Sequence, residues 1–260
     1  MDLNLRGRRA LVTGGSKGIG LAVAEELVAE GVHVAICARH PRELDAAAEK
    51  LRGSGCTVYA QVTDVTDPAQ ITDLVSRSVE ALGALDILVN NAGAAHPGNF
   101  ESLTDDDWRA DLDVKLFSQI RCTRAALEHL RRSRAARVIN INSVYARYPD
   151  PTFFATTVNR AACLNFTKAL ARELGPEGIL VNSVNIGFVI TPQWQNIKAR
   201  RAPDASDDEF FAGLARDEVP LGRFGTVGEV SGLVAFLSSD RASYLTGTSI
   251  DVAGGMGKYV

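Results

Sequence analysis

The amino-acid sequence predicts a three-layer α/β/α domain built on a doubly wound parallel β-sheet. Short apolar segments alternate with longer segments of helical periodicity along the whole chain. The first apolar segment also runs directly into a glycine-rich turn. Parallel strands joined by helical crossovers place helices on both faces of one sheet. Because the 260 residues contain no internal repeat or low-complexity linker, residues 1–260 are predicted to form one domain.

The predicted elements follow one another regularly. Strands are predicted at 9–13, 32–38, 58–62, 85–90, 136–141, 179–185 and 249–252. Helices are predicted at 19–31, 41–51, 67–82, 105–132, 155–174 and 227–237. The 105–132 segment is long enough that we expect a break or bend near Asp111. Residues 192–225 are polar, charged and irregular in pattern.

Composition excludes several classes of function. The chain is 46% hydrophobic and 23% charged, with a net charge of −3, so neither nucleic acid nor membrane is expected as a partner. No stretch approaches the roughly 20 apolar residues that span a bilayer, and the N-terminus lacks the apolar core of a secretory signal. The cysteines and histidines fall at no metal-ligand spacing. We therefore expect a cytoplasmic protein without a metal.

The glycine-rich turn at residues 13–20 (Thr-Gly-Gly-Ser-Lys-Gly-Ile-Gly) joins a predicted strand to a predicted helix. In that position Gly14 permits a tight turn, Gly18 lets the backbone approach a pyrophosphate, and Gly20 allows close helix packing. Amides at the helix start then bind phosphate oxygens. The pattern predicts a Rossmann-type dinucleotide site, with candidate contacts at Gly14, Ser16, Lys17, Gly18, Ile19 and Gly20.

The end of the second predicted strand distinguishes NAD from NADP. An acidic residue there binds the ribose hydroxyls of NAD, whereas a cation accommodates the 2′-phosphate of NADP. The sequence has Arg39 at this point, no carboxylate before Glu43, and Lys17 as a second cation on the same side. Arg39 alone would also suit a solvated surface position. Together with Lys17 it favours NADP(H) over NAD(H).

Further motifs match the short-chain dehydrogenase/reductase family. They lie at 13–20, 64–65, 90–93, 143, 181–187, 245–247 and 254–255. The chain resembles this family over essentially its full length, although Ile186 stands where the family usually has proline. The resemblance implies a substrate-covering segment at about 192–225, a small-molecule substrate and a homotetramer or homodimer. It also implies cofactor contacts from Asp64, Val65, Asn91, Ala92, Gly93, Gly187, Val189 and Thr191.

The family's catalytic residues are an asparagine, a serine, a tyrosine thirteen residues after it and a lysine four residues later. Only Ser143 matches in this sequence. The tyrosine position is occupied by Thr156, the lysine position by Arg160 and the asparagine position by Lys115. An alkyl hydroxyl is a far weaker acid than a tyrosine, whose pKa is about 10. Arginine can hold ribose hydroxyls but does not shuttle protons.

The loss of the usual acid leaves four candidate replacements. Tyr145 and Tyr148 follow Ser143 in a loop expected to border the substrate, and His96 follows the 90–93 motif. Lys115 would supply a cation or a tuned amine. We rank Tyr145 first, because it lies only two residues after Ser143, whose own place in the site follows from the motif. Packing or pocket lining alone would also account for each of these residues. Ser143 would likewise be accounted for as a cap at the strand end.

Three functions remain open from the sequence. The first is an NADP(H)-dependent oxidoreductase of a carbonyl or alcohol with a non-standard proton-transfer site. The second is a lyase or isomerase that keeps the fold but not the redox step. The third is a catalytically silent protein that binds NADPH or supports a partner chain.

Overall fold

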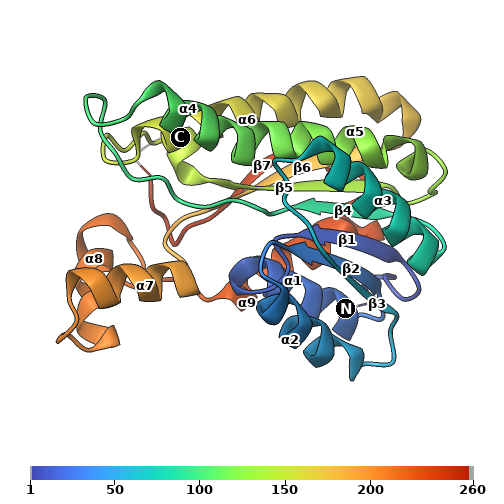
Figure 1. Cartoon of the computed structure of the whole chain (residues 1–260), viewed down its shortest axis with the longest axis horizontal. Helices are drawn as coiled ribbons and strands as arrows, with labels where there is room; N and C mark the ends of the chain where they lie inside the picture. Colours follow the sequence, from blue (N-terminus) through green and yellow to red (C-terminus); the bar gives the residue numbers. More distant parts are fainter. Residues whose placement is uncertain (1, 258–260) are drawn as a thin grey trace.

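The computed structural model describes residues 2–257, which form one seven-stranded sheet. All neighbouring strands are parallel, in the order β3-β2-β1-β4-β5-β6-β7 (Figure 1). The predicted doubly wound sheet is therefore confirmed. The strand order reverses direction between β1 and β4, and ligands of such sheets bind at this switch point, outside the carboxyl ends of the strands.

The elements agree with the sequence-based expectations to within a few residues at each end. The strands are β1 (Arg9–Thr13), β2 (His33–Ala38), β3 (Val58–Val62), β4 (Ile87–Asn90), β5 (Arg137–Ser143), β6 (Leu180–Ile186) and β7 (Ser249–Val252). The helices are α1 (Gly18–Ala29), α2 (Pro41–Arg52), α3 (Pro68–Leu82), α4 (Asp105–Leu112), α5 (Ser118–Leu130), α6 (Phe154–Leu174), α7 (Pro192–Arg201), α8 (Asp207–Glu218) and α9 (Val227–Ser238).

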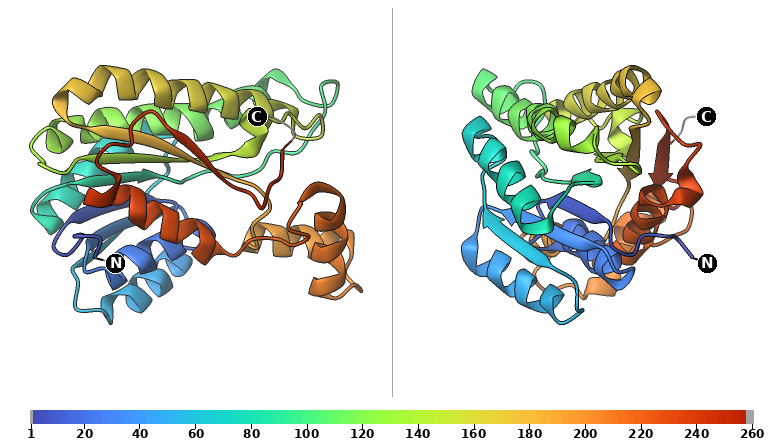
Figure 2. Two further views of the ribbon diagram at one scale, coloured as in Figure 1. Left: turned by 180° about the vertical axis from the view of Figure 1, so that it is seen from behind. Right: turned by 90° about the vertical axis from the view of Figure 1, so that its right-hand side faces the viewer.

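Two apolar cores lie on the two faces of the sheet. Side chains alternate along a strand, so Ala10 and Val12 of β1 pack with α1, α2 and α9, whereas Leu11 packs with α3, α5 and α6. Figure 2 shows the sheet between these two helical layers. Burial on both faces explains why the strands read as continuous apolar runs.

The long helix predicted at 105–132 is interrupted, as expected near Asp111. Helix α4 ends at Leu112, one π-helical turn follows at Asp113–Phe117, and α5 begins at Ser118. Such turns insert one residue into the helical ladder and occur frequently at functional sites. Here the turn contains Lys115, whose side chain is fully buried.

Residues 192–225, whose sequence pattern is irregular, contain the helices α7 and α8. They project from the body of the domain beside α9 (Figure 1). Ser206 begins α8 with a reciprocal capping box to Glu209, a start signal that the sequence already contained. An aromatic cluster made by Phe188, Trp194, Phe211 and Phe224 holds the pair against the chain that follows β6.

Within residues 2–257 no helix is long and apolar enough to cross a membrane. Across the same residues, no group of three or more histidine, cysteine, aspartate or glutamate side chains is placed to hold a metal ion.

Candidate active site

The glycine-rich turn lies at the switch point, between the end of β1 and the start of α1. Gly14 and Gly18 have φ angles of 68° and 56°, values that residues other than glycine rarely adopt. A Cβ atom on Gly20 would lie 2.2 Å from the carbonyl oxygen of Gly14 and 2.4 Å from Asn91 Nδ2. The third glycine is therefore required by close packing of the turn on its own helix.

The loop after β4 is hydrogen-bonded to this turn. The amides of Asn91 and Ala92 both donate to Thr13 Oγ1 at 3.0 Å. Asn91 Nδ2 donates to the carbonyl oxygens of Thr13 at 2.9 Å and Gly14 at 3.2 Å. The Asn91 side chain thus fixes the turn, while the backbone of the loop faces the switch point.

The start of α1 fits a bound pyrophosphate. Lys17 at its N-cap makes no side-chain capping bond, and the first turn contains no acidic residue. The amides of that turn are therefore open to an anion, and the positive end of the helix dipole favours one. A dinucleotide would be held here by the 14–20 backbone. Opposite, the N-terminus of α7 closes the site, with Pro192 Cδ 3.6 Å from a Cβ built on Gly18.

The charge near the end of β2 is less positive than the sequence suggested. Arg39 is exposed, but Lys17 Nζ forms an ion pair with Glu43 at 2.8 Å. The hydrogen bond from Lys17 lowers the pKa of Glu43 below its usual value, so this carboxyl is ionised at neutral pH. Of the two cations that the sequence placed on this side, Lys17 is thus partly neutralised.

The remaining residues predicted to contact the cofactor occupy the same edge of the sheet or the loops beyond it. Asp64 Oδ1 accepts hydrogen bonds from Thr66 N at 2.9 Å and Thr66 Oγ1 at 2.8 Å, so its carboxylate closes the turn after β3. Val65 and Val189 are buried. Gly187 follows β6, where a Cβ would lie 2.8 Å from Ala253 Cβ.

Ser143 ends β5, next to the switch point. Its Oγ accepts a hydrogen bond from the amide of Tyr145 at 3.2 Å, which caps the short 3₁₀ turn Val144–Ala146. The serine acts here as an acceptor, and its own hydroxyl proton is not used in this bond. The capping interpretation and a substrate contact are therefore compatible.

Arg160 reaches from α6 to the edge of the sheet between β4 and β5. Its Nη1 donates to the carbonyl oxygen of Ile141 at 2.9 Å, and its Nη2 would lie 3.2 Å from a Cβ built on Gly93. No residue in the described part of the chain accepts a hydrogen bond from the buried Arg160 Nε. A buried donor without a partner at this position fits a ligand with hydroxyl or phosphate oxygens.

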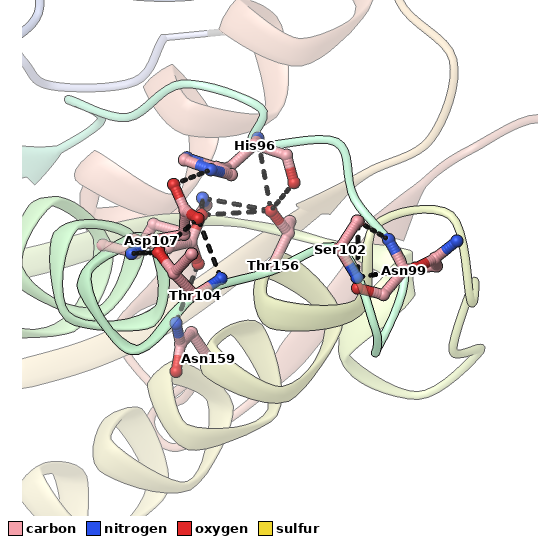
Figure 3. Close-up of polar contacts among 9 residues, drawn as sticks. His96, Asn99, Ser102, Thr104, Asp107, Thr156 and Asn159 are labelled. Carbon is pink, nitrogen blue, oxygen red and sulfur yellow. Dashed lines mark hydrogen bonds and ion pairs between the residues drawn. The ribbon is translucent and has the colours of Figure 1, made fainter.

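Thr156 lies at the centre of a buried polar cluster (Figure 3). Lys115 Nζ donates to Thr156 Oγ1 at 3.2 Å and forms an ion pair with Asp111 Oδ1. Thr156 Oγ1 also lies 3.1 Å from Asp111 Oδ1, and Asn159 Nδ2 donates to Asp111 Oδ2 at 2.8 Å. Helix α6 and the π-helical turn therefore bring three of the four predicted catalytic positions to one region.

The ammonium group of Lys115 is tuned by opposing influences. Burial and the nearby charge of Arg160 lower its pKa, and Asp111 raises it, with the result at about 8. The Cys163 thiol donates to the carbonyl of Lys115 at 3.5 Å and contributes a small upward influence. A lysine that exchanges its proton near neutral pH is chemically suited to general acid–base work.

Comparison with known proteins shows which family the chain belongs to. Residues 14–257 match the family model described as enoyl-(acyl carrier protein) reductase. The chain is 35% identical to the 3-oxoacyl-[acyl-carrier-protein] reductase FabG of Salmonella typhimurium, an alignment that covers 98% of this chain and 99% of the relative. The chain belongs to the short-chain dehydrogenase/reductase family.

Solved structures with a similar fold include the following two. One is a short-chain oxidoreductase from Pseudomonas aeruginosa PAO1, with NADPH bound and described as containing an atypical catalytic center. It is 38% identical with a TM-score of 0.91, covering 97% of this chain and 98% of that chain. The other is L-sorbose reductase from Gluconobacter frateurii in complex with NADPH and L-sorbose. It is 31% identical with a TM-score of 0.96, covering both chains fully.

The other candidate acids of this short-chain dehydrogenase/reductase have different surroundings. The Tyr145 ring stacks on Phe153 with centroids 5.8 Å apart, and burial together with the negative charge of Asp150 raises the pKa of Tyr145 further above its usual value. The His96 imidazole lies 3.2 Å from a carboxylate oxygen of Asp107, and the two side chains are 35% and 36% exposed. The Tyr148 side chain lines a hollow beside α8. The pKa of Tyr145, which the sequence ranked first, is thus shifted away from neutral pH, whereas that of Lys115 is shifted toward it.

Sequence reasoning missed the partners of Lys115. Asp111 was noted only as the place of a helix break, and Asn159 was not singled out. The four-residue separation of Asp111 and Lys115 was a usable signal, because side chains at that spacing meet on one helix face. The sequence around Asp111 and Lys115 contains no signal that these two residues contact α6.

Proposed function

We propose that the protein is an NADPH-dependent reductase of a carbonyl compound in which Lys115 donates the proton that the family's tyrosine otherwise supplies. The observation that carries the proposal is the burial of Lys115 against Thr156, with a pKa of about 8. When bound, NADPH supplies the hydride. A well-placed general acid contributes typically about 10²–10⁴-fold to the rate.

The other site residues take complementary roles. Ser143, at the end of β5, would orient the carbonyl oxygen with its free hydroxyl proton. Arg160 would hold ribose hydroxyls through its unpaired Nε, and it keeps Lys115 acidic through its charge. Thr156 accepts a hydrogen bond from Lys115 and so holds the ammonium in place. None of these tasks requires threonine or arginine to release a proton.

The preference for NADP(H) is part of the proposal. It is supported by Arg39, by the absence of a carboxylate at the end of β2 and by the NADPH present in both similar structures. The Lys17–Glu43 pair weakens the positive charge at this point but does not introduce an acidic residue at the ribose position.

We also propose that the protein is a cytoplasmic homodimer or homotetramer that acts on a small molecule. Assembly is supported by exposed apolar side chains on the helical layer that contains α3, α5 and α6. Phe117 and Val158 are 41% and 47% exposed there. Light scattering at several protein concentrations tests the oligomeric state separately.

The test of the reaction is NADPH consumption with a panel of carbonyl compounds that includes a 3-oxoacyl thioester and a ketose. Lys115→Met should lower kcat by about 10²–10⁴-fold and leave the NADPH Kd unchanged. Lys168→Met removes an exposed lysine of α6 and serves as the matched control. Tyr145→Phe should retain activity.

Other outcomes point to the other functions. If Lys115→Met is active and Tyr145→Phe is inactive, the proton donor is Tyr145 and not Lys115. Turnover without NADPH consumption would indicate a lyase or isomerase. Tight NADPH binding without turnover of any compound would indicate a binding protein.

A further inference from the structure

We infer that Asp111 and Asn159 are positioning residues that hold Lys115 ready to donate its proton. The inference rests on the proposed role of Lys115. It is carried by a continuous buried chain of contacts from Asn159 through Asp111 to Lys115 and Thr156. Figure 3 shows Thr156 and Asn159 on neighbouring turns of one helix, both directed toward this cluster.

Both oxygens of the Asp111 carboxylate are committed. Oδ1 contacts the Lys115 ammonium and the Thr156 hydroxyl, and Oδ2 accepts from Asn159. A carboxylate fixed at both oxygens cannot rotate away from the ammonium. Since Asp111 lies on α4 and Asn159 on α6, the carboxylate also depends on how these two helices pack.

A stabilising role alone explains this arrangement poorly. The Asp111 and Lys115 side chains are both 0% exposed, and replacing a buried ion pair by apolar residues is often neutral or stabilising. The pair also stands at the π-helical turn, where the regular helical hydrogen bonding is disturbed. A costly pair at an irregular turn near the charge of Arg160 is consistent with a part in the reaction.

The charges around Lys115 oppose one another. Asp111 faces it from α4, and Arg160 and Cys163 face it from α6. Burial raises the pKa of Cys163, so the thiol stays neutral at physiological pH. The His96 imidazole and Asp107, which lie 3.2 Å apart, are both partly exposed. Asp111 is thus the nearby carboxylate that counters the effect of Arg160 and keeps the proton on Lys115.

The step that Asp111 supports is a single proton transfer. An N–H bond of the Lys115 ammonium breaks and an O–H bond forms on the carbonyl oxygen of the substrate, whose carbonyl carbon takes up the hydride. Lys115 becomes a neutral amine beside an ionised Asp111, which stays bound to Asn159. The uncompensated buried carboxylate then favours return of a proton from solvent to Lys115.

The test measures the pKa of Lys115 directly by NMR of protein labelled with [ε-¹³C]lysine. The chain has six lysines, and Lys115→Met assigns the signal by its loss. Asp111→Asn should lower the pKa of Lys115 by about one to three pH units, and the alkaline limb of kcat/KM should move down by the same amount. Asp111→Glu keeps the charge and should restore much of the difference.

Asn159→Ala provides a second variant that leaves the ion pair in place. It should lower kcat by on the order of 10- to 100-fold through loss of orientation, with the NADPH Kd unchanged. Asp113→Asn is the matched control, since Asp113 lies two residues from Asp111 but pairs with Arg121 at 2.7 Å. It should leave both the Lys115 signal and the pH profile unchanged.

An unchanged Lys115 pKa in Asp111→Asn, or an unchanged kcat in Asn159→Ala, would overturn the inference. Failure of the proposed function gives a different result. In that case Lys115→Met keeps full turnover while the NMR shift in Asp111→Asn still occurs.

Discussion

The ammonium nitrogen of Lys115 lies 3.2 Å from the hydroxyl oxygen of Thr156, the residue that occupies the family's tyrosine position. Lys115 comes from the π-helical turn and Thr156 from α6, 41 positions further along the chain. The contact places a group with a pKa of about 8 beside a hydroxyl that is itself too weak an acid. An ionisable proton therefore lies beside the residue that the motif comparison aligns with the family's tyrosine.

The pH profile follows from the required protonation state. Reduction needs the ammonium form of Lys115, so kcat/KM for reduction should be constant at low pH and fall by roughly tenfold per pH unit above about 8. Oxidation of the alcohol needs the neutral amine, and its rate should rise through the same pH. Lys115→Arg should be as impaired as Lys115→Met over the whole pH range, because the guanidinium keeps its charge but does not release its proton. A flat wild-type profile between pH 7 and 9 would contradict the assignment.

Thr156→Val removes the hydroxyl at nearly constant volume. Lys115 and Asp111 each lose a buried hydrogen-bond partner, so the free energy of unfolding should fall by about 1–3 kcal/mol and turnover should drop. Thr157→Val is the control, because the neighbouring hydroxyl binds the backbone of Asp150 instead. Thermal denaturation and initial rates should show similar stability losses but a catalytic loss only in Thr156→Val.

Glu43→Gln tests the charge balance at the end of β2. The substitution releases Lys17 from its ion pair, so NADPH should bind up to about fivefold more tightly while NADH affinity stays the same. Glu49→Gln makes the same charge change on α2, where the carboxylate pairs with Arg52. Equal effects of both variants in calorimetric titrations would indicate a general charge effect and no role for Lys17.

Gly20→Ala tests the packing of the glycine turn. The added Cβ would meet the Gly14 carbonyl at 2.2 Å, and the backbone has to move to relieve this contact. We expect a stability loss of about 1–3 kcal/mol and loss of dinucleotide binding. Gly213→Ala adds the same methyl group to α8 with no atom within 4 Å and should not weaken binding. Retained NADPH affinity in Gly20→Ala would show that the turn does not need this packing.

The sequence by itself determined the architecture and the dinucleotide turn. Strand periodicity, helical periodicity and glycine spacing are local properties, and they depend on interactions between residues that are near in the chain. Comparison with the family's motif also located the four positions at Ser143, Thr156, Arg160 and Lys115. It placed Tyr145 first among the replacement acids because of its proximity to Ser143, whereas the proposal made here assigns the proton donation to Lys115.

Only the tertiary structure decided which groups surround Lys115. Burial, the charge of Arg160 and the carboxylate of Asp111 all depend on how α4, the π-helical turn and α6 pack, and a pKa is set by that environment. The same holds for Glu43, which reaches Lys17 from another helix. Local spacing and the family's motif therefore supplied the candidate residues of the site, whereas the surroundings that set their chemistry depend on contacts between segments far apart in the chain.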